Sequence, residues 1–280
     1  MEILVARHAG FCFGVERAID IVESAADSGE QIATFGPIIH NPQVVNNFAS
    51  KGICSVNNMD EINKDTAVIV RSHGIEKQVF EKLKEKSKQV IDATCPFVQK
   101  AQKAASELSK SCDKVIILGE SDHPEVKGII SYINGDYIVI EKLEDVIDFE
   151  FQERYGFVAQ TTQNQEVFKA IAEVLATKCN ELLTAKTICS ATERRQEAAL
   201  EVASLVEVMI VIGGKNSANT TRLYRLCKEI CKNTYHIETE QEINASMIKG
   251  FNKIGITAGA STPVELITKV REYILEVGHE

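Results

Sequence analysis

The chain has 280 residues, of which 44% are hydrophobic and 25% are charged, and its formal net charge is −9. The hydrophobic content is enough for a real core, and the negative charge argues against a general nucleic-acid binder, since phosphate affinity comes mainly from Lys and Arg. Glu2 and Arg7 interrupt the first apolar run, which argues against a signal peptide, and no apolar stretch approaches membrane-spanning length. We therefore expect a cytoplasmic protein that binds neither nucleic acid nor membrane.

Short β-rich runs alternate with helical patterns from one end of the chain to the other. The runs expected to form strands are residues 3–6, 32–35, 53–56, 67–71, 90–93, 115–118, 137–140, 156–159, 186–188, 208–212, 234–237 and 253–257. Near-continuous apolar strands separated by helices predict mainly parallel sheets that are covered by helices on both faces. The predicted fold class is therefore α/β.

Three cysteines, Cys12, Cys95 and Cys189, stand at junctions where a helical pattern begins. Pro96 fits the first position of a helix, which places Cys95 at or beside the N-cap. A thiol at this place meets the positive end of the helix dipole, which favours the thiolate.

The same spacing follows each of these cysteines. Twenty-eight residues later stand His40, His123 and Ser217, each four positions after a glycine that ends a strand. A further strand in each third ends at a second polar junction, at residues 71–74, 159–162 and 258–261. This repeat predicts three related units, which cover residues 1–94 with the N-terminal strand, 95–188 and 189–280.

Ligands of open parallel sheets bind beyond the carboxyl ends of the strands, and all of these junctions occupy such positions. If the three units face one centre, Cys12, Cys95 and Cys189 form a tripod of thiolates there. A structural zinc site uses four protein ligands, usually in close pairs, and these cysteines have no such pattern. A tripod leaves one metal position open, which suits either a catalytic zinc ion or a cubane iron–sulfur cluster.

The polar junctions also predict an anion site, because backbone N–H groups at helix N-termini bind anions without a lysine. The side chains expected to complete a phosphate or diphosphate site are His40, His73, Ser217, Asn219 and Ser261. Glu125 is the acid that closely follows one of these junctions. It is either a first-turn residue that the helix dipole stabilises, or a proton donor whose pKa is raised by burial in a closed cavity.

The motifs around these residues occur in a fixed order: Ala9-Gly-Phe-Cys-Phe-Gly-Val, Gly36-Pro-Ile-Ile-His-Asn, Arg71-Ser-His-Gly, Asp92-Ala-Thr-Cys-Pro, His123-Pro-Glu-Val-Lys-Gly, Gln160-Thr-Thr-Gln, Ile188-Cys-Ser-Ala-Thr, Gly214-Lys-Asn-Ser-Ala-Asn and Thr257-Ala-Gly-Ala-Ser. In these motifs the chain resembles the family of 4-hydroxy-3-methylbut-2-enyl diphosphate reductases, also called LytB or IspH, over essentially its whole length. The resemblance implies a cloverleaf of three pseudo-threefold-related α/β units around a central 4Fe-4S cluster. The cluster would be held by Cys12, Cys95 and Cys189, with one iron open to substrate.

The resemblance also assigns roles to the polar junctions. It implies a catalytic centre in which Glu125 delivers protons, assisted by Thr161, beside His123. The residues implied to bind the substrate, chiefly its diphosphate, are His40, His73, His123, Thr161, Ser217, Ala218, Asn219 and Ser261. Ala218 stands where relatives often have a second serine, so only its backbone N–H is expected to contact phosphate.

The activity that the resemblance implies is reductive dehydroxylation of (E)-4-hydroxy-3-methylbut-2-enyl diphosphate. The products are isopentenyl diphosphate and dimethylallyl diphosphate, in the last step of the non-mevalonate (methylerythritol phosphate) isoprenoid pathway. No dinucleotide fingerprint is evident, and the family implies reduced ferredoxin or flavodoxin as the electron donor. Two alternatives are a zinc-dependent hydrolase or lyase acting on a phosphorylated substrate, and an iron–sulfur redox sensor.

Overall fold

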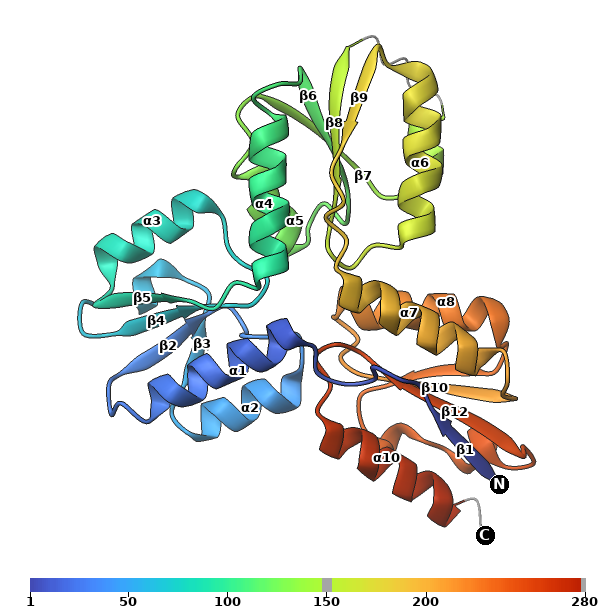
Figure 1. Cartoon of the computed structure of the whole chain (residues 1–280). Helices are drawn as coiled ribbons and strands as arrows, with labels where there is room; N and C mark the ends of the chain where they lie inside the picture. Colours follow the sequence, from blue (N-terminus) through green and yellow to red (C-terminus); the bar gives the residue numbers. More distant parts are fainter. Residues whose placement is uncertain (148–152, 278–280) are drawn as a thin grey trace. The chain divides into compact units, whose positions relative to one another are not determined.

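Figure 1 shows the computed structural model of the chain, which describes residues 1–147 and 153–277. Over these residues the chain forms three four-stranded sheets. Every pair of neighbouring strands in them is parallel. The predicted α/β class with parallel sheets flanked by helices is confirmed.

The first sheet has the strand order β3-β2-β4-β5. Its strands are β2 (Ile32–Phe35), β3 (Cys54–Val56), β4 (Ala67–Val70) and β5 (Gln89–Asp92). Its helices are α1 (Phe13–Ala26), α2 (Pro42–Ser50), α3 (Lys77–Lys86) and the 3-10 helix η1 (Met59–Glu61). Leu83 of α3 and Ile62 pack with Val68 and Val70 on one face, while α1 and α2 lie on the other (Figure 1).

The second sheet repeats this order as β7-β6-β8-β9. Its strands are β6 (Lys114–Leu118), β7 (Asp136–Ile140), β8 (Arg154–Ala159) and β9 (Glu181–Thr184). Its helices are α4 (Pro96–Leu108), α5 (Pro124–Ile130), α6 (Gln165–Lys178) and the 3-10 helix η2 (Leu143–Val146). The alternation of side chains along β6 explains the two cores, since Ile116 and Leu118 pack against α6 whereas Val115 and Ile117 pack against α4 and α5.

The third sheet has the order β11-β10-β12-β1. Its strands are β10 (Val208–Ile212), β11 (Thr234–Ile237), β12 (Lys253–Ala258) and β1 (Glu2–Val5). Its helices are α7 (Ser190–Ala203), α8 (Ala218–Ile230), α9 (Ala245–Ile248), α10 (Val264–Val277) and the 3-10 helix η3 (Glu240–Glu242). Met209 and Val211 face α7 and α8, whereas Ile210 and Ile212 face α10.

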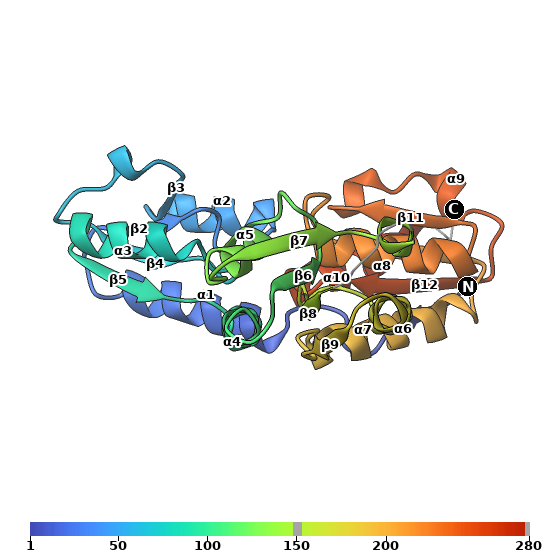
Figure 2. The same cartoon turned by 90° about the horizontal axis from the view of Figure 1, so that it is seen from above.

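The N-terminal strand β1 completes the third sheet by pairing with β12, although the sequence analysis placed it with the first unit. β1 takes the edge position that β5 and β9 have in the other two sheets. In those sheets the edge strand follows a helix directly, α3 before β5 and α6 before β9. The start of β1 and the end of α10 lie close together in both views of the chain (Figures 1 and 2). The chain ends therefore fall where the other repeats have a helix-to-strand connection.

The expected strand at residues 186–188 lies elsewhere, because β9 is formed by Glu181–Thr184. After β9 the chain is joined to β8 by the side chain of Thr187 rather than by backbone hydrogen bonds of a strand. Its Oγ1 accepts a hydrogen bond from Ala159 N at 2.8 Å and donates one to Ala159 O at 2.7 Å. These bonds hold the segment that leads to Cys189 against the end of β8.

The chain divides into two compact units. Unit 1 consists of Met1–Glu16, His40–Val44 and Ser190–Glu280, and it contains the third sheet. Unit 2 consists of Arg17–Ile39 and Val45–Cys189, and it contains the first and second sheets. The predicted boundaries at residues 94/95 and 188/189 stay a prediction.

Candidate functional site

Each of the three cysteines comes directly before a helix, as the sequence predicts. Cys12 precedes α1, Cys95 is the N-cap of α4 with Pro96 behind it, and Cys189 precedes α7. All three side chains are partly exposed. Each thiol thus lies at the N-terminal end of a helix.

A backbone hydrogen bond ties each cysteine to one of the predicted polar junctions. The N–H groups of Cys12, Cys95 and Cys189 donate to the carbonyl oxygens of Ala260 (3.2 Å), Ser72 (2.9 Å) and Thr161 (3.0 Å). In each repeat the cysteine follows the edge strand, and the acceptor follows the strand next to it. The parallel pairing of β1 with β12, β5 with β4 and β9 with β8 therefore brings every cysteine beside a junction.

Glu125 and Thr161 form a buried pair in unit 2. Glu125 lies in the first turn of α5 and is 1% exposed, and Thr161 follows β8. The carboxylate of Glu125 accepts hydrogen bonds from the backbone N of Thr161 at 2.6 Å and from its Oγ1 at 2.8 Å. Glu125 is thus a first-turn acid that is also buried, and burial is what the proton-donor alternative requires.

Burial raises the pKa of Glu125 from 4.5 to about 7, against the opposing effect of the two hydrogen bonds from Thr161. The charge of Glu120 raises the pKa slightly further. A carboxyl with a pKa near neutral is protonated often enough to donate a proton and ionised often enough to recover one. The pair is therefore suited to general acid catalysis.

His123 lies beside Glu125 and caps the same helix. Its Nδ1 accepts a hydrogen bond from the backbone N of Glu125 at 3.1 Å. Burial, with a smaller effect from the charge of Arg71, lowers the pKa of His123 to about 4, so the ring is neutral at pH 7. The His73 ring meets the His123 ring edge-on, with 5.8 Å between centroids. Unit 2 thus brings His73, His123, Glu125 and Thr161 together, with Cys95 and Cys189 next to their junctions.

Unit 1 places the other predicted residues at the start of α8. Ser217 is the N-cap, and its Oγ accepts a hydrogen bond from Thr220 N at 3.4 Å. Ala218 is the first helical residue and is partly exposed, while Asn219 is buried. Among the residues that the structure describes, the Asn219 Nδ2 atom has no hydrogen-bond partner. A buried amide without a partner is costly, which indicates a ligand at this helix end.

His40 and Ser261 are joined in the same unit. Ser261 Oγ donates a hydrogen bond to His40 O at 3.0 Å, and Asn41 Nδ2 donates one to Ser261 O at 2.9 Å. Asn41 also caps α2, because its Oδ1 accepts from the backbone N atoms of Gln43 and Val44. Since Ala260 accepts from Cys12 N, this network lies directly beside Cys12. Unit 1 thus brings together Cys12, His40 and Ser261.

The sequence analysis did not single out two buried residues at this site. Arg195 is 3% exposed, and its Nη2 donates to Gly10 O at 2.8 Å, which anchors the loop that leads to Cys12. Thr220 is fully buried and packs against Gly213 and Gly259. Arg195 could have been found, because it continues the buried helical stripe of Ala198, Ala199 and Val202 one turn earlier.

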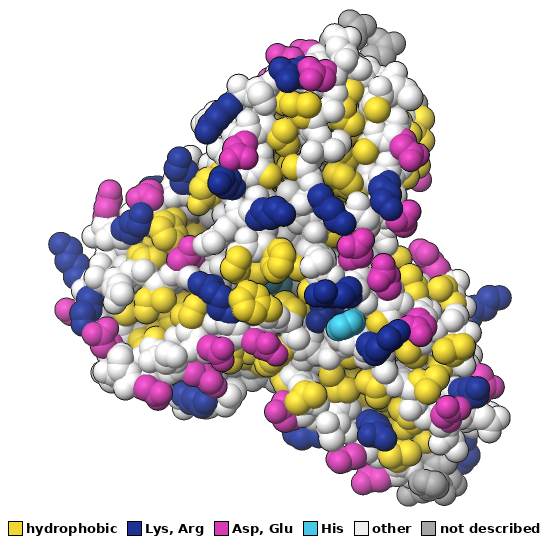
Figure 3. Space-filling view, in the orientation of Figure 1, with side chains coloured by type: hydrophobic (Ala, Val, Ile, Leu, Met, Phe, Trp, Pro, Cys, Tyr) yellow, Lys and Arg dark blue, Asp and Glu magenta, His cyan; other side chains and the backbone are white. Residues whose placement is uncertain are grey.

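Two searches of the described residues bear on metals and membranes. No group of three or more His, Cys, Asp or Glu side chains there is arranged to hold a metal ion. No helix in residues 1–147 and 153–277 is long and apolar enough to cross a bilayer. On the face shown in Figure 3, acidic and basic side chains are intermixed.

Comparisons with known proteins agree with these motifs. The family model described as LytB protein matches residues 3–275. A 4-hydroxy-3-methylbut-2-enyl diphosphate reductase of Aquifex aeolicus is 45% identical over 281 residues, which cover 99% of this chain and 97% of that protein.

Two solved structures are also similar. One is titled as (E)-4-hydroxy-3-methyl-but-2-enyl diphosphate reductase, the terminal enzyme of the non-mevalonate pathway. It is 44% identical, covers 99% of this chain and 100% of its own, and has a TM-score of 0.70. The other is the E-1-hydroxy-2-methyl-but-2-enyl-4-diphosphate reductase of Plasmodium falciparum, with 27% identity, coverage of 98% and 87%, and a TM-score of 0.89.

Proposed function

Because the chain belongs to the LytB protein family, we propose that it catalyses the reductive dehydroxylation of (E)-4-hydroxy-3-methylbut-2-enyl diphosphate. The allylic C–O bond breaks, two electrons and two protons are taken up, and water leaves. A new C–H bond at one or the other end of the allyl group gives isopentenyl diphosphate or dimethylallyl diphosphate. This reaction is the last step of the non-mevalonate isoprenoid pathway. The observation that carries the proposal is the buried Glu125–Thr161 pair.

Glu125 supplies the protons. Its pKa of about 7 keeps a large share of the carboxyl protonated at neutral pH, although it is closed off from water. Thr161 Oγ1, at 2.8 Å from the carboxylate, can pass a proton between Glu125 and the leaving hydroxyl. Protonation converts hydroxide into water, which is a far better leaving group.

The residues that we propose to bind the diphosphate are histidines and the groups at the start of α8. Neutral His123 and its neighbour His73 donate ring N–H groups from unit 2, together with His40 from unit 1. The start of α8 offers Ser217, the unpartnered amide of Asn219 and the backbone N–H of Ala218, while Ser261 lies beside Cys12. These contacts are remote from the bond that breaks, so their binding energy can orient the substrate.

We propose an iron–sulfur cofactor, which the chemistry and the local placement of three cysteines support. Cys12, Cys95 and Cys189 lie at equivalent helix starts, each fixed by its backbone to a junction that carries a proposed substrate ligand. Thiolates are the ligands that iron–sulfur clusters use, and these three would hold a 4Fe-4S cluster. When bound, such a cluster would supply the electrons and a Lewis acid for the departure of the hydroxyl. Arg195 holds the loop before Cys12 in place for this role.

Reduced ferredoxin or flavodoxin is the electron donor that we propose. The expected cytoplasmic location stays a prediction, and so do the three unit boundaries.

The cofactor is tested by anaerobic purification of the protein and of the Cys95→Ser variant. The wild type should be brown, absorb near ~400 nm and contain about four irons per chain. The variant should lose most of its iron and sulfide and all turnover, whereas Cys112→Ser, at a partly exposed cysteine outside the junctions, should keep both. A colourless wild type with one zinc would favour the zinc hydrolase or lyase instead. A cluster-containing protein that never reduces the substrate would favour the redox sensor.

A further inference from the structure

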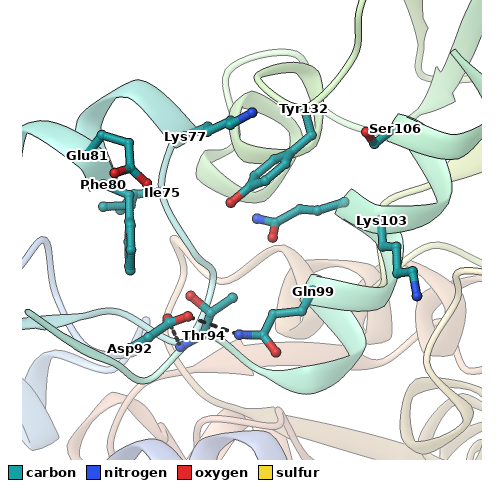
Figure 4. A pocket seen from close by; sticks show the side chains of 11 residues that line it. Ile75, Lys77, Phe80, Glu81, Asp92, Thr94, Gln99, Lys103, Ser106 and Tyr132 are labelled. Atoms are coloured by element: carbon teal, nitrogen blue, oxygen red, sulfur yellow. Dashed lines mark hydrogen bonds between the residues drawn. The ribbon is translucent and has the colours of Figure 1, made fainter. Parts of the chain in front are cut away.

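A cavity lies within unit 2, apart from the residues assigned above. Its volume is 450 Å³, and it opens between α3, the end of β5, α4 and the chain after α5 (Figure 4). This volume falls in the range of small-molecule sites, which runs from about 300 to 1,000 Å³.

Buried polar groups line the cavity. Thr94 is 5% exposed and Gln102 is 6% exposed, and neither side chain makes a hydrogen bond within the described residues. The Tyr132 hydroxyl also points into the opening (Figure 4) and has no hydrogen-bond partner in residues 1–147 and 153–277. The polar atoms of these side chains are open to the cavity rather than sealed in the core, so they are available to a ligand.

Asp92 adds a fixed acceptor. Its Oδ1 accepts from Thr94 N at 2.9 Å, and its Oδ2 accepts from Gln99 Nε2 at 3.0 Å. Each carboxylate oxygen accepts more than one hydrogen bond, so Asp92 can accept another from a ligand. Because both bonds hold the carboxylate still, it is oriented before a ligand arrives.

The remaining lining has two different characters. Ile75, Phe80 and the ring of Tyr132 provide apolar surface. Lys77 is exposed at the rim of the cavity, and its Nζ lies 5.9 Å from the centroid of the Tyr132 ring. The other charged groups there have partners of their own, since Lys103 pairs with Glu107 at 3.9 Å and Glu81 pairs with Lys84 at 3.0 Å. A ligand that fits must therefore have a flat apolar body, hydrogen-bonding groups on its edge and a negative charge at the end that faces solvent.

We propose that this cavity binds a purine nucleotide. The aromatic rings contact the base, and Gln102 pairs with adjacent donor and acceptor atoms on its edge, as glutamine does with adenine N6 and N7. Asp92 accepts from an exocyclic amine, and Thr94 donates or accepts. Lys77 binds the phosphate at the rim.

The position of the cavity couples it to the proposed active site. Ile75 lies two residues after His73, and Thr94 comes immediately before Cys95. Tyr132 follows α5, the helix that carries Glu125 in its first turn. A bound nucleotide therefore contacts three segments that lead to residues of the proposed active site. Binding at this cavity does not depend on the proposed function.

Binding is tested by titrating AMP into the anaerobically purified full-length protein in a calorimeter. We expect saturable one-site binding with a Kd below about 1 mM. Gln102→Met removes the hydrogen bonds of the glutamine amide to the edge of the base at similar side-chain volume, and it should weaken binding at least about tenfold. Tyr132→Phe removes the hydroxyl that points into the cavity and should weaken binding by a similar factor. Gln78→Met changes an exposed glutamine of α3 outside the cavity and should bind AMP like the wild type.

Several outcomes would overturn the proposal. No binding of AMP or GMP at millimolar concentration would do so, and so would equal binding of ribose 5-phosphate, which has no base. Binding that both cavity variants leave unchanged, and that the diphosphate substrate displaces, would place AMP among the diphosphate ligands instead. Binding that needs Gln102 and coexists with substrate would support the proposal, even in a preparation without reductase activity.

Discussion

Glu125 and Asn219 occupy equivalent places in two repeats, and their surroundings differ in an informative way. Each is the second residue of its helix and lies two residues after a capping residue, His123 or Ser217. Both are buried. Yet Glu125 receives two hydrogen bonds from Thr161, whereas Asn219 Nδ2 receives no partner from the described part of the chain.

The comparison separates two kinds of functional residue. The surroundings of Glu125 are complete without a ligand, because the protein itself sets its pKa and orientation. The surroundings of Asn219 are incomplete, so its unpaired amide contributes only when an acceptor such as phosphate binds. We therefore propose that equivalent backbone positions carry a proton donor in unit 2 and a binding group in unit 1.

The largest effect is expected for Glu125→Gln. The amide keeps the size of the side chain and can still bond Thr161, but it cannot donate a proton to the leaving hydroxyl. Turnover should fall about 10²- to 10⁴-fold, the usual contribution of a general acid. Steady-state rates with a chemical reductant measure this loss, and the iron content should stay that of the wild type.

The matched control for that variant is Asp122→Asn, which changes a fully exposed carboxylate in the same loop. It should turn over substrate at the wild-type rate. Equal losses in both variants would show that the loop, rather than the acidity of Glu125, controls the rate.

The raised pKa of Glu125 also predicts how stability depends on pH. The folded protein keeps this proton up to about pH 7, whereas the unfolded chain loses it near 4.5. Stability therefore falls as pH rises from 4.5 to 7, by about 3 kcal/mol, since each pKa unit corresponds to about 1.4 kcal/mol. Glu125→Gln lacks this cost and should raise Tm by about 5 °C or more at pH 8 but not at pH 4.5.

The low pKa of His123 acts in the opposite direction. Because the buried ring resists protonation, stability is lost as pH falls from 6.5 toward 4. Wild type and Glu125→Gln both contain His123, so the difference between their melting curves isolates Glu125. Parallel curves from pH 4.5 to 8 would contradict the raised pKa.

Sequence reasoning located the helix starts well, because the signals are local. Proline after Cys95, the equal spacing of His40, His123 and Ser217, and the apolar strands were enough to predict the parallel sheets and the cysteines at helix N-termini. The same spacing makes Glu125 and Asn219 equivalent. What the spacing does not contain is the partner of each side chain.

Those partners depend on packing between segments far apart in the chain. The bonds of Thr161 to Glu125 span 36 residues, and the bond of Arg195 to Gly10 spans 185. The pairing of β1 with β12 is likewise nonlocal, which is why the N-terminal strand was expected in the first unit. The regularity of a repeat predicts where functional residues stand, and only tertiary contacts decide whether each acts alone or awaits a ligand.

A smaller effect is expected for Asn219→Leu. Loss of a hydrogen bond from the side-chain amide to a charged phosphate costs about 1.5–3 kcal/mol of binding free energy. KM should therefore rise about 10- to 100-fold, with a lesser change in kcat. The variant should melt at or above the wild-type temperature without substrate, because it removes an unpaired buried amide. Asn216→Leu, at an exposed asparagine in the same loop, is the control and should leave KM unchanged. A drop in Tm for Asn219→Leu would mean that the amide is already paired in the free protein.

The smallest effect is expected for changes at Gly259 and Thr220, which are in contact beside Asn219 in unit 1. A Cβ on Gly259 would lie 2.0 Å from Thr220 Oγ1, so Gly259→Ala forces Thr220, next to Asn219, to move. Overpacking of this kind costs about 1–3 kcal/mol of stability, measured as a lower denaturation midpoint.

Thr220→Ala removes a hydroxyl that has no hydrogen-bond partner in the described residues, so it should cost less stability and relieve the clash. The double variant should therefore be more stable than the sum of the single changes predicts. If the two changes simply add, the two side chains do not compete for space, and the start of α8 is looser than the buried contacts around Glu125.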